Sequence, residues 1–227
     1  MKPFANRPIA VFALSSLLAL GCAAFLVTPV AVAAQAPAED AAFAAAFQAF
    51  IRAGKGDSSA VDPAADAFTA LAAAHPGDPV ILAYAGAATA QRATTTMLPW
   101  RKMHYAEDGL AQIDKALALL GPANDAPAQM GTPGVLNTRF TAASTFLALP
   151  SMFHRHERGE QLLAQVVDSP LLVNAPLPFR GSVWLRAGRA AMEDGAPDRA
   201  RKLWQMAIDQ AAPQAAEARQ KLQELPR

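Results

Sequence analysis

Apolar residues recur at helical spacing along most of the chain. Phe47 and Phe50 follow Phe43 by four and seven residues, so the three side chains fall on one face of a helix. The same rhythm, interrupted by proline, glycine and asparagine, predicts eight further helices and no strand. The expected helices cover residues 39–54, 62–74, 80–93, 101–120, 132–149, 154–167, 179–193, 197–211 and 213–224.

Two Asp-Pro pairs predict where helices begin. Asp62 precedes Pro63, and Asp78 precedes Pro79. An aspartate side chain accepts hydrogen bonds from the free amides of a first turn, and proline fits the first helical position. We therefore expect Asp62 and Asp78 to cap the second and third helices.

Small residues and a tryptophan share one face in each of the helices 179–193 and 197–211. Small residues allow two helices to approach closely, and the tryptophans fill the space between them. The residues are Trp184, Ala187, Gly188 and Ala191 in the first helix, and Ala200, Trp204 and Ala207 in the second. Their spacing resembles the tetratricopeptide repeat, a helix-turn-helix unit of about 34 residues, although Pro213 lies one residue later than the closing proline of that family.

Weaker matches to the same pattern precede this unit. Residues 64–76 match a second helix with its closing proline, and residues 110–122 match another, with Asp114 where an aromatic residue is usual. Residues 98–116 also look similar to a group of uncharacterised bacterial repeat proteins, which suggests no activity. The resemblance implies an all-α fold of antiparallel helix pairs, stacked as a short right-handed solenoid with a polar C-terminal capping helix.

The resemblance also implies a binding surface, because the first helix of each repeat lines a concave groove in that family. On the clearest unit this face would present Ser182, Leu185, Arg189 and Met192. A guanidinium such as that of Arg189 can bind a carboxylate, for example a peptide C-terminus. The alternative is a salt-bridged surface, in which the arginines of this region pair with Glu193, Asp194 and Asp198.

The first 34 residues have the pattern of a signal peptide. Lys2 and Arg7 precede an apolar run over residues 8–27, and Ala31-Val32-Ala33 has small residues where signal peptidase cleaves. We expect cleavage near Ala33 or Ala34, a linker over residues 35–39 and a helical repeat domain over residues 40–227. Two alternatives stay open: the run is long enough to remain as a membrane anchor, and Leu20-Gly21-Cys22 resembles a lipoprotein box.

Composition supports a helical, exported protein. About a quarter of the residues are alanine, which favours helices and disfavours strands. Cys22 is the only cysteine, so removal of the leader leaves neither a disulfide nor a thiol nucleophile. The net charge of +1 predicts no nucleic-acid partner. Membrane contact is expected only through a retained N-terminal segment or a lipidated Cys22.

Two segments carry residues of chemical interest. In a loop His154 and His156 could bind one metal, but on a helix, two residues apart, they face opposite sides. Glu160 follows His156 by four residues and could share its face, but two ligands fall short of a site. Arg101 and Lys102 follow Trp100 at a predicted helix start, where free amides would favour an anionic ligand or a peptide. The alternative is that Trp100 packs into the core and both cations are solvated.

No nucleotide-binding motif and no nucleophile elbow occur in the chain, and no cofactor or metal site is expected. The expected function is that of an exported, non-enzymatic helical scaffold that binds a protein or peptide in the cell envelope, in the periplasm or secreted. One alternative is a small periplasmic metal-dependent hydrolase that uses His154 and His156. The other is a structural component of the envelope, held in the inner membrane by an uncleaved N-terminal helix.

Overall fold

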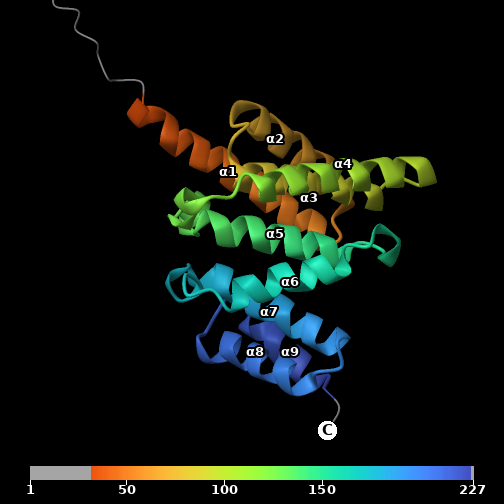
Figure 1. Cartoon of the computed structure of the whole chain (residues 1–227), viewed down its shortest axis with the longest axis vertical. Helices are drawn as coiled ribbons and strands as arrows, with labels where there is room; N and C mark the ends of the chain where they lie inside the picture. The colour runs from red at the N-terminus through yellow and green to blue at the C-terminus, as the bar shows by residue number, and fades with distance from the viewer. Residues whose placement is uncertain (1–31, 226–227) are drawn as a thin grey trace, which may run out of the picture.

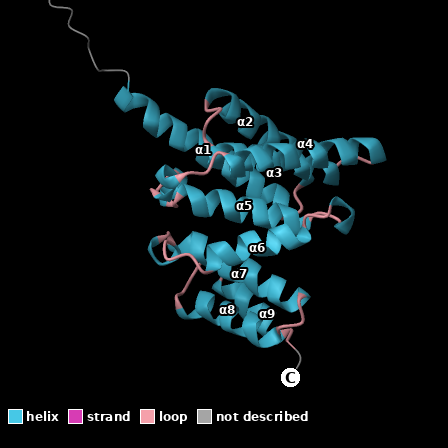
Figure 2. Ribbon diagram, viewed as in Figure 1, coloured by secondary structure: helices cyan, strands magenta, loops and turns pink. Residues whose placement is uncertain are grey.

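The chain folds as an all-helical stack. The structure, a computed structural model, describes residues 32–225, with side chains from residue 40 onward. Within this range it has nine α-helices, joined by turns and short 3₁₀ segments, and no strand (Figure 2). The helices are α1 (Val32–Gly54), α2 (Val61–Ala74), α3 (Pro79–Gln91), α4 (Pro99–Ala118), α5 (Gly134–Ala148), α6 (His156–Val167), α7 (Leu177–Glu193), α8 (Pro197–Asp209) and α9 (Ala215–Gln223). All nine expected helices are therefore present.

The start of α1 differs from the prediction. The helix begins at Val32, so residues 35–39, expected as a linker, lie within it. Alternate residues of this stretch are alanines, the strongest helix formers, and they extend the helix toward the N-terminus. The charged and apolar parts of the expected signal peptide, with Cys22, lie outside the described residues. Within the described residues, no helix combines the length and apolar character needed to span a bilayer.

Asp78 caps α3 as predicted. Its carboxylate accepts hydrogen bonds from the backbone amides of Val80 at 2.8 Å and Ile81 at 3.1 Å, and Pro79 occupies the first helical position. The second carboxylate oxygen accepts a hydrogen bond from the side-chain amide of Gln129 at 2.7 Å. The same residue thus begins the helix and holds the loop that precedes α5.

The predicted role of Asp62 is wrong. A 3₁₀ turn leads directly into α2, which begins one residue earlier, at Val61, so Asp62 lies inside the first helical turn. Its carboxylate instead accepts a hydrogen bond from Nε of Arg92 at 2.9 Å, and Asp66 accepts one from the same guanidinium at 2.5 Å. The two aspartates therefore connect α2 to the segment after α3, and do not cap a helix.

Helices that follow each other in the chain pack against each other. The most extensive contacts join α3 with α4, α5 with α6 and α7 with α8. Figure 1 shows these pairs arranged along the long axis of the molecule, from α1 and α2 at one end to α8 and α9 at the other. An aromatic core around Phe43, Phe68 and Tyr84 unites α1, α2 and α3, and a larger core that includes Trp184 and Trp204 extends to α9.

Candidate functional site

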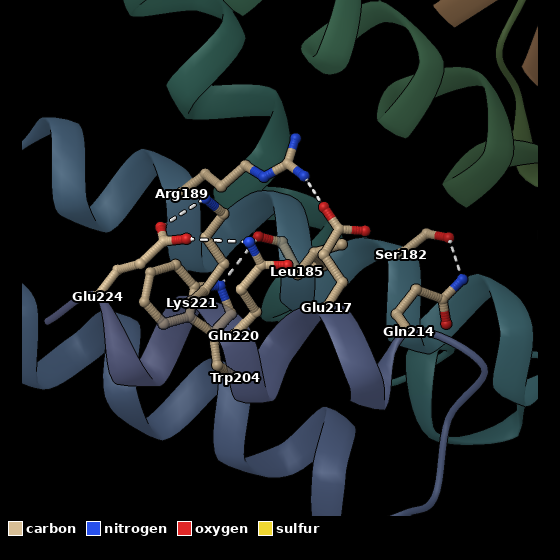
Figure 3. A network of polar contacts seen from close by, with 9 residues as sticks. All are labelled: Ser182, Leu185, Arg189, Trp204, Gln214, Glu217, Gln220, Lys221 and Glu224. Atoms are coloured by element: carbon tan, nitrogen blue, oxygen red, sulfur yellow. Dashed lines mark hydrogen bonds and ion pairs between the residues drawn. The ribbon is translucent and has the colours of Figure 1, made fainter. Parts of the chain in front are cut away.

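Helix α9 packs mainly on α8, and side chains from α9 and the residue before it reach the face of α7 that was expected to bind a partner (Figure 3). The guanidinium of Arg189 forms an ion pair with the carboxylate of Glu217 from α9. The hydroxyl of Ser182 accepts a hydrogen bond from the side-chain amide of Gln214 at 2.9 Å, just before α9 begins. The arrangement brings Ser182 and Arg189 together along one surface, as predicted, but that surface is already occupied by the chain itself.

Leu185 lies beneath this surface. Its side chain is only 8 % exposed, and its carbonyl oxygen accepts a hydrogen bond from the indole N–H of Trp204 at 3.2 Å. Leu185 therefore belongs to the core between α7 and α8 and does not line a groove. Met192 is half-buried, at the far end of the same row.

A shallow depression remains where α9 ends against α7. Its exposed lining consists of carboxylates, a lysine and an arginine, and the buried indole of Trp204 lies beneath them. Its lining residues are Arg189, Met192, Glu193, Trp204, Glu217, Gln220, Lys221, Glu224 and Leu225.

Positive charge is concentrated on the α7 side of the contact. Arg186 lies about one turn before Arg189 on α7, and Nη1 of its guanidinium stands 3.8 Å from a carboxylate oxygen of Glu193. Burial lowers the pKa of Arg186, against the opposing attraction of Glu193. Glu193 pairs with Arg186. Among the described ion pairs, the carboxylate that pairs with Arg189 is therefore that of Glu217 on α9. Of the acidic residues expected to pair with arginines here, Glu193 does so.

The second expected set, Arg101 and Lys102, lies apart from the first, on the exposed opening turn of α4. Trp100 is 65 % exposed, so the alternative that it packs into the core is wrong. The first buried residue of α4 is Ala106, because the preceding two turns extend beyond the neighbouring helices. Tyr105 is half-buried.

The histidines do not form a shared centre. His154 has a left-handed backbone with φ of 51° and lies outside α6, whereas His156 is its first residue. Nδ1 of His156 lies 3.2 Å from Oε1 of Glu160, so these two residues share a face as predicted. Burial and the adjacent Asp194 raise the pKa of Glu160. Among the described residues, no group of three potential metal-ligating side chains converges.

One polar cluster was not predicted. Asp114 accepts hydrogen bonds from Arg155 at 2.8 Å and from Arg158 at 2.5 Å, which joins α4 to α6 and the residue before it. Both guanidinium carbons lie 5.5 Å from the ring centre of Phe146 on α5. The only signal in the sequence was an aspartate where the resembled repeat has an aromatic residue.

Comparison with known proteins gives no relative from which a function could be carried over. No protein-family model, no curated protein and no solved structure matches the chain. Arguments about function therefore rest on the residues and contacts of this chain itself.

Proposed function

We propose that this protein is an exported, non-enzymatic helical-repeat scaffold of the tetratricopeptide type, which binds a protein segment in the bacterial cell envelope. The succession of packed helix pairs supports the repeat interpretation, as does the direct contact between α3 and α5, the first helices of adjacent pairs. Export rests on the leader pattern of residues 1–34. A right-handed stack of such pairs would place the first helices on one side.

The observation that carries the proposal is the set of polar contacts that already joins α9 and Gln214 to α7. Helix α9 packs mainly on α8, through the buried Ala215 and Ala218 and the partly buried Leu222, and it reaches α7 through the ion pair of Glu217 with Arg189. A short helix with small residues on one side and a carboxylate between them thus fits this surface. We infer that a partner segment of the same chemistry binds there by displacing α9.

The energetic balance favours such an exchange. The side chains of Arg189 and Glu217 are each 45 % exposed, and ion pairs of this exposure contribute at most about 1 kcal/mol. The apolar part of the contact consists of two buried alanines and the partly buried Leu222 and Leu225, which is less than the buried surface of a core helix such as α3, so α9 is held less tightly than α3. A partner with a longer apolar face would therefore compete successfully while keeping the carboxylate opposite Arg189.

A labelled peptide of residues 213–225 tests the site directly. We expect weak binding to the wild-type chain, because its own α9 fills the surface, and at least about tenfold tighter binding to Glu217→Lys, in which repulsion from Arg189 releases α9. Arg189→Glu should bind the peptide weakly. The matched control is Glu107→Lys, the same charge reversal at an exposed residue of α4, away from the contact of α9 with α7.

Two results separate the outcomes. Hydrogen exchange of the amides in α9 shows whether Glu217→Lys has released the helix. If α9 exchanges freely and the peptide still does not bind, α9 is only a cap and the site is rejected. In an envelope fraction, a photo-crosslinker at Met192 should then yield a protein adduct that disappears with Arg189→Glu and persists with Arg199→Glu, an exposed arginine of α8.

A further inference from the structure

Exposed apolar side chains gather at one point of the molecule. Met97 is 87 % exposed, Leu98 is 38 % exposed and Trp100 is 65 % exposed, all within four consecutive residues. The other large apolar side chains that are exposed in the described part of the chain occur one at a time: Leu119, Met130, Met152, Val173 and Met206. Scattered residues of this kind are normal on a surface, but a cluster marks a contact.

The cluster stands on a projection and not in a groove. Helix α4 begins at Pro99, and no residue before Ala106 is buried, so its first two turns extend past the neighbouring helices (Figure 1). A convex apolar tip needs a partner that it can enter. The interface of a lipid bilayer meets this need without a complementary pocket, and tryptophan is enriched at that depth.

The charges beside the cluster specify the kind of bilayer. Arg101 and Lys102 are exposed, the first turn of α4 contains no acidic residue, and the first carboxylate of the helix is that of Glu107. Positive potential from the helix N-terminus adds to both cations. His104 approaches Asp108, with Nε2 3.1 Å from Oδ2, so this carboxylate faces the histidine one turn further along. The tip therefore combines apolar side chains with cations, which suits anionic headgroups.

We propose that the α4 tip, formed by Met97, Leu98, Trp100, Arg101 and Lys102, docks the folded domain on an anionic membrane surface. The apolar side chains enter the headgroup region, and the two cations bind lipid phosphates. The tip lies on α4, far along the chain from the α7–α9 contact, so membrane docking and partner binding use different surfaces. A domain held in this way contacts the membrane whether or not residues 1–34 remain attached.

Tryptophan fluorescence tests the proposal on the full chain, because Trp184 and Trp204 are only 4 % and 2 % exposed and Trp100 dominates any change. We expect a blue shift, and quenching by brominated acyl chains, with vesicles that contain phosphatidylglycerol. Vesicles of phosphatidylcholine alone should give little change, and salt should weaken the effect.

Paired variants locate the contact. Arg101→Glu with Lys102→Glu should weaken sedimentation with phosphatidylglycerol vesicles at least about tenfold. Trp100→Ser should weaken it as well. The matched controls are Arg201→Glu with Lys202→Glu, an adjacent exposed Arg-Lys pair on α8, and Met152→Ser, an isolated exposed apolar residue. Both controls should bind like the wild type.

Three results would overturn the proposal. Equal binding of all variants would assign membrane contact to another part of the chain, such as residues 1–31. Equal loss in the α4 and α8 charge variants would indicate attraction by general positive charge. A protein adduct from a photo-crosslinker at Met97, together with no vesicle binding, would make the tip a protein-binding surface instead.

Discussion

The indole ring of Trp204 on α8 lies directly against the backbone of Gly188 on α7. A Cβ atom at position 188 would overlap the indole nitrogen, which donates its hydrogen to the carbonyl oxygen of Leu185 at 3.2 Å. Because Gly188 has no side chain, α7 and α8 approach closely, and the indole of Trp204 forms its buried hydrogen bond. This contact positions the helix pair on which α9 rests.

We predict that Gly188→Ala destabilises the protein although alanine is the better helix former. The propensity gain is about 1 kcal/mol, whereas overlap with a buried indole costs roughly 1 to 3 kcal/mol. Urea unfolding should therefore show a net loss of up to about 2 kcal/mol. The control is Gly77→Ala, where an added Cβ meets nothing within 4 Å. A stabilised Gly188→Ala protein would contradict the contact.

The helices could be predicted because their ends are determined locally. Asp78 and Pro79 show this at the start of α3, where the capping bonds span only two and three residues. The close contact of Gly188 with Trp204 was also predictable, since small residues at helical spacing indicate a packed face. These features depend on neighbours along the chain or on one adjacent helix.

The other features depend on how far each helix extends and on what crosses it. The pattern around Trp100 is the same whether a turn is covered or projects, so its exposure could not be deduced. Asp62 has the local pattern of a cap, but the helix starts one residue earlier and Arg92 draws its carboxylate away. The ion pair of Arg189 with Glu217 joins residues 28 positions apart, and no local pattern specifies it.

A second close crossing, between α3 and α4, gives a coupled prediction. A Cβ at Gly86 would stand 2.6 Å from the carbonyl oxygen of Gly109, and a Cβ at Gly109 would stand 2.5 Å from the carbonyl oxygen of Gly86. Each alanine variant should lose about 1 to 3 kcal/mol, because backbone cannot move aside as a side chain can. The double variant should lose less than the sum, since one separation of the helices accommodates both methyl groups. Additive losses in denaturant unfolding would show that the two sites are independent.

Tyr84 predicts a loss of stability at high pH. Burial raises its pKa to about 12 from the ordinary 10.0. Between these values the unfolded chain releases the phenolic proton and the folded chain retains it, so stability falls as the pH rises from 10 toward 12. In a Tyr105→Phe variant, in which Tyr84 is the remaining tyrosine, phenolate absorbance should show that the ionisation of Tyr84 coincides with unfolding. Ionisation of Tyr84 near pH 10 while the protein stays folded would contradict its burial.

Replacement of the same tyrosine tests its hydrogen bond. The phenolic hydroxyl of Tyr84 donates to Oδ1 of Asn137 at 2.9 Å inside the core. Tyr84→Phe should cost about 1 to 3 kcal/mol near neutral pH, because the amide oxygen of Asn137 is left buried without that donor. It should also abolish the part of the alkaline transition that Tyr84 causes. The double variant Tyr84→Phe with Asn137→Leu tests whether the two residues interact. Its loss of unfolding free energy should be smaller than the sum of the two single losses.

The contacts of Asp114 predict that its carboxylate fixes the conformation of two arginine side chains, those of Arg155 and Arg158. Asp114→Asn removes the charge that holds Arg155 and Arg158 over Phe146, so both guanidinium groups should become mobile in the absence of a counter-charge. These side chains are partly exposed, and we therefore expect a modest loss of about 0.5 to 1.5 kcal/mol that diminishes in high salt. Asp108→Asn is the control, because Asp108 approaches only the exposed His104. Unfolding at low and high salt measures both variants, and an equal, salt-independent effect would show that the cluster does not join α4 to α6.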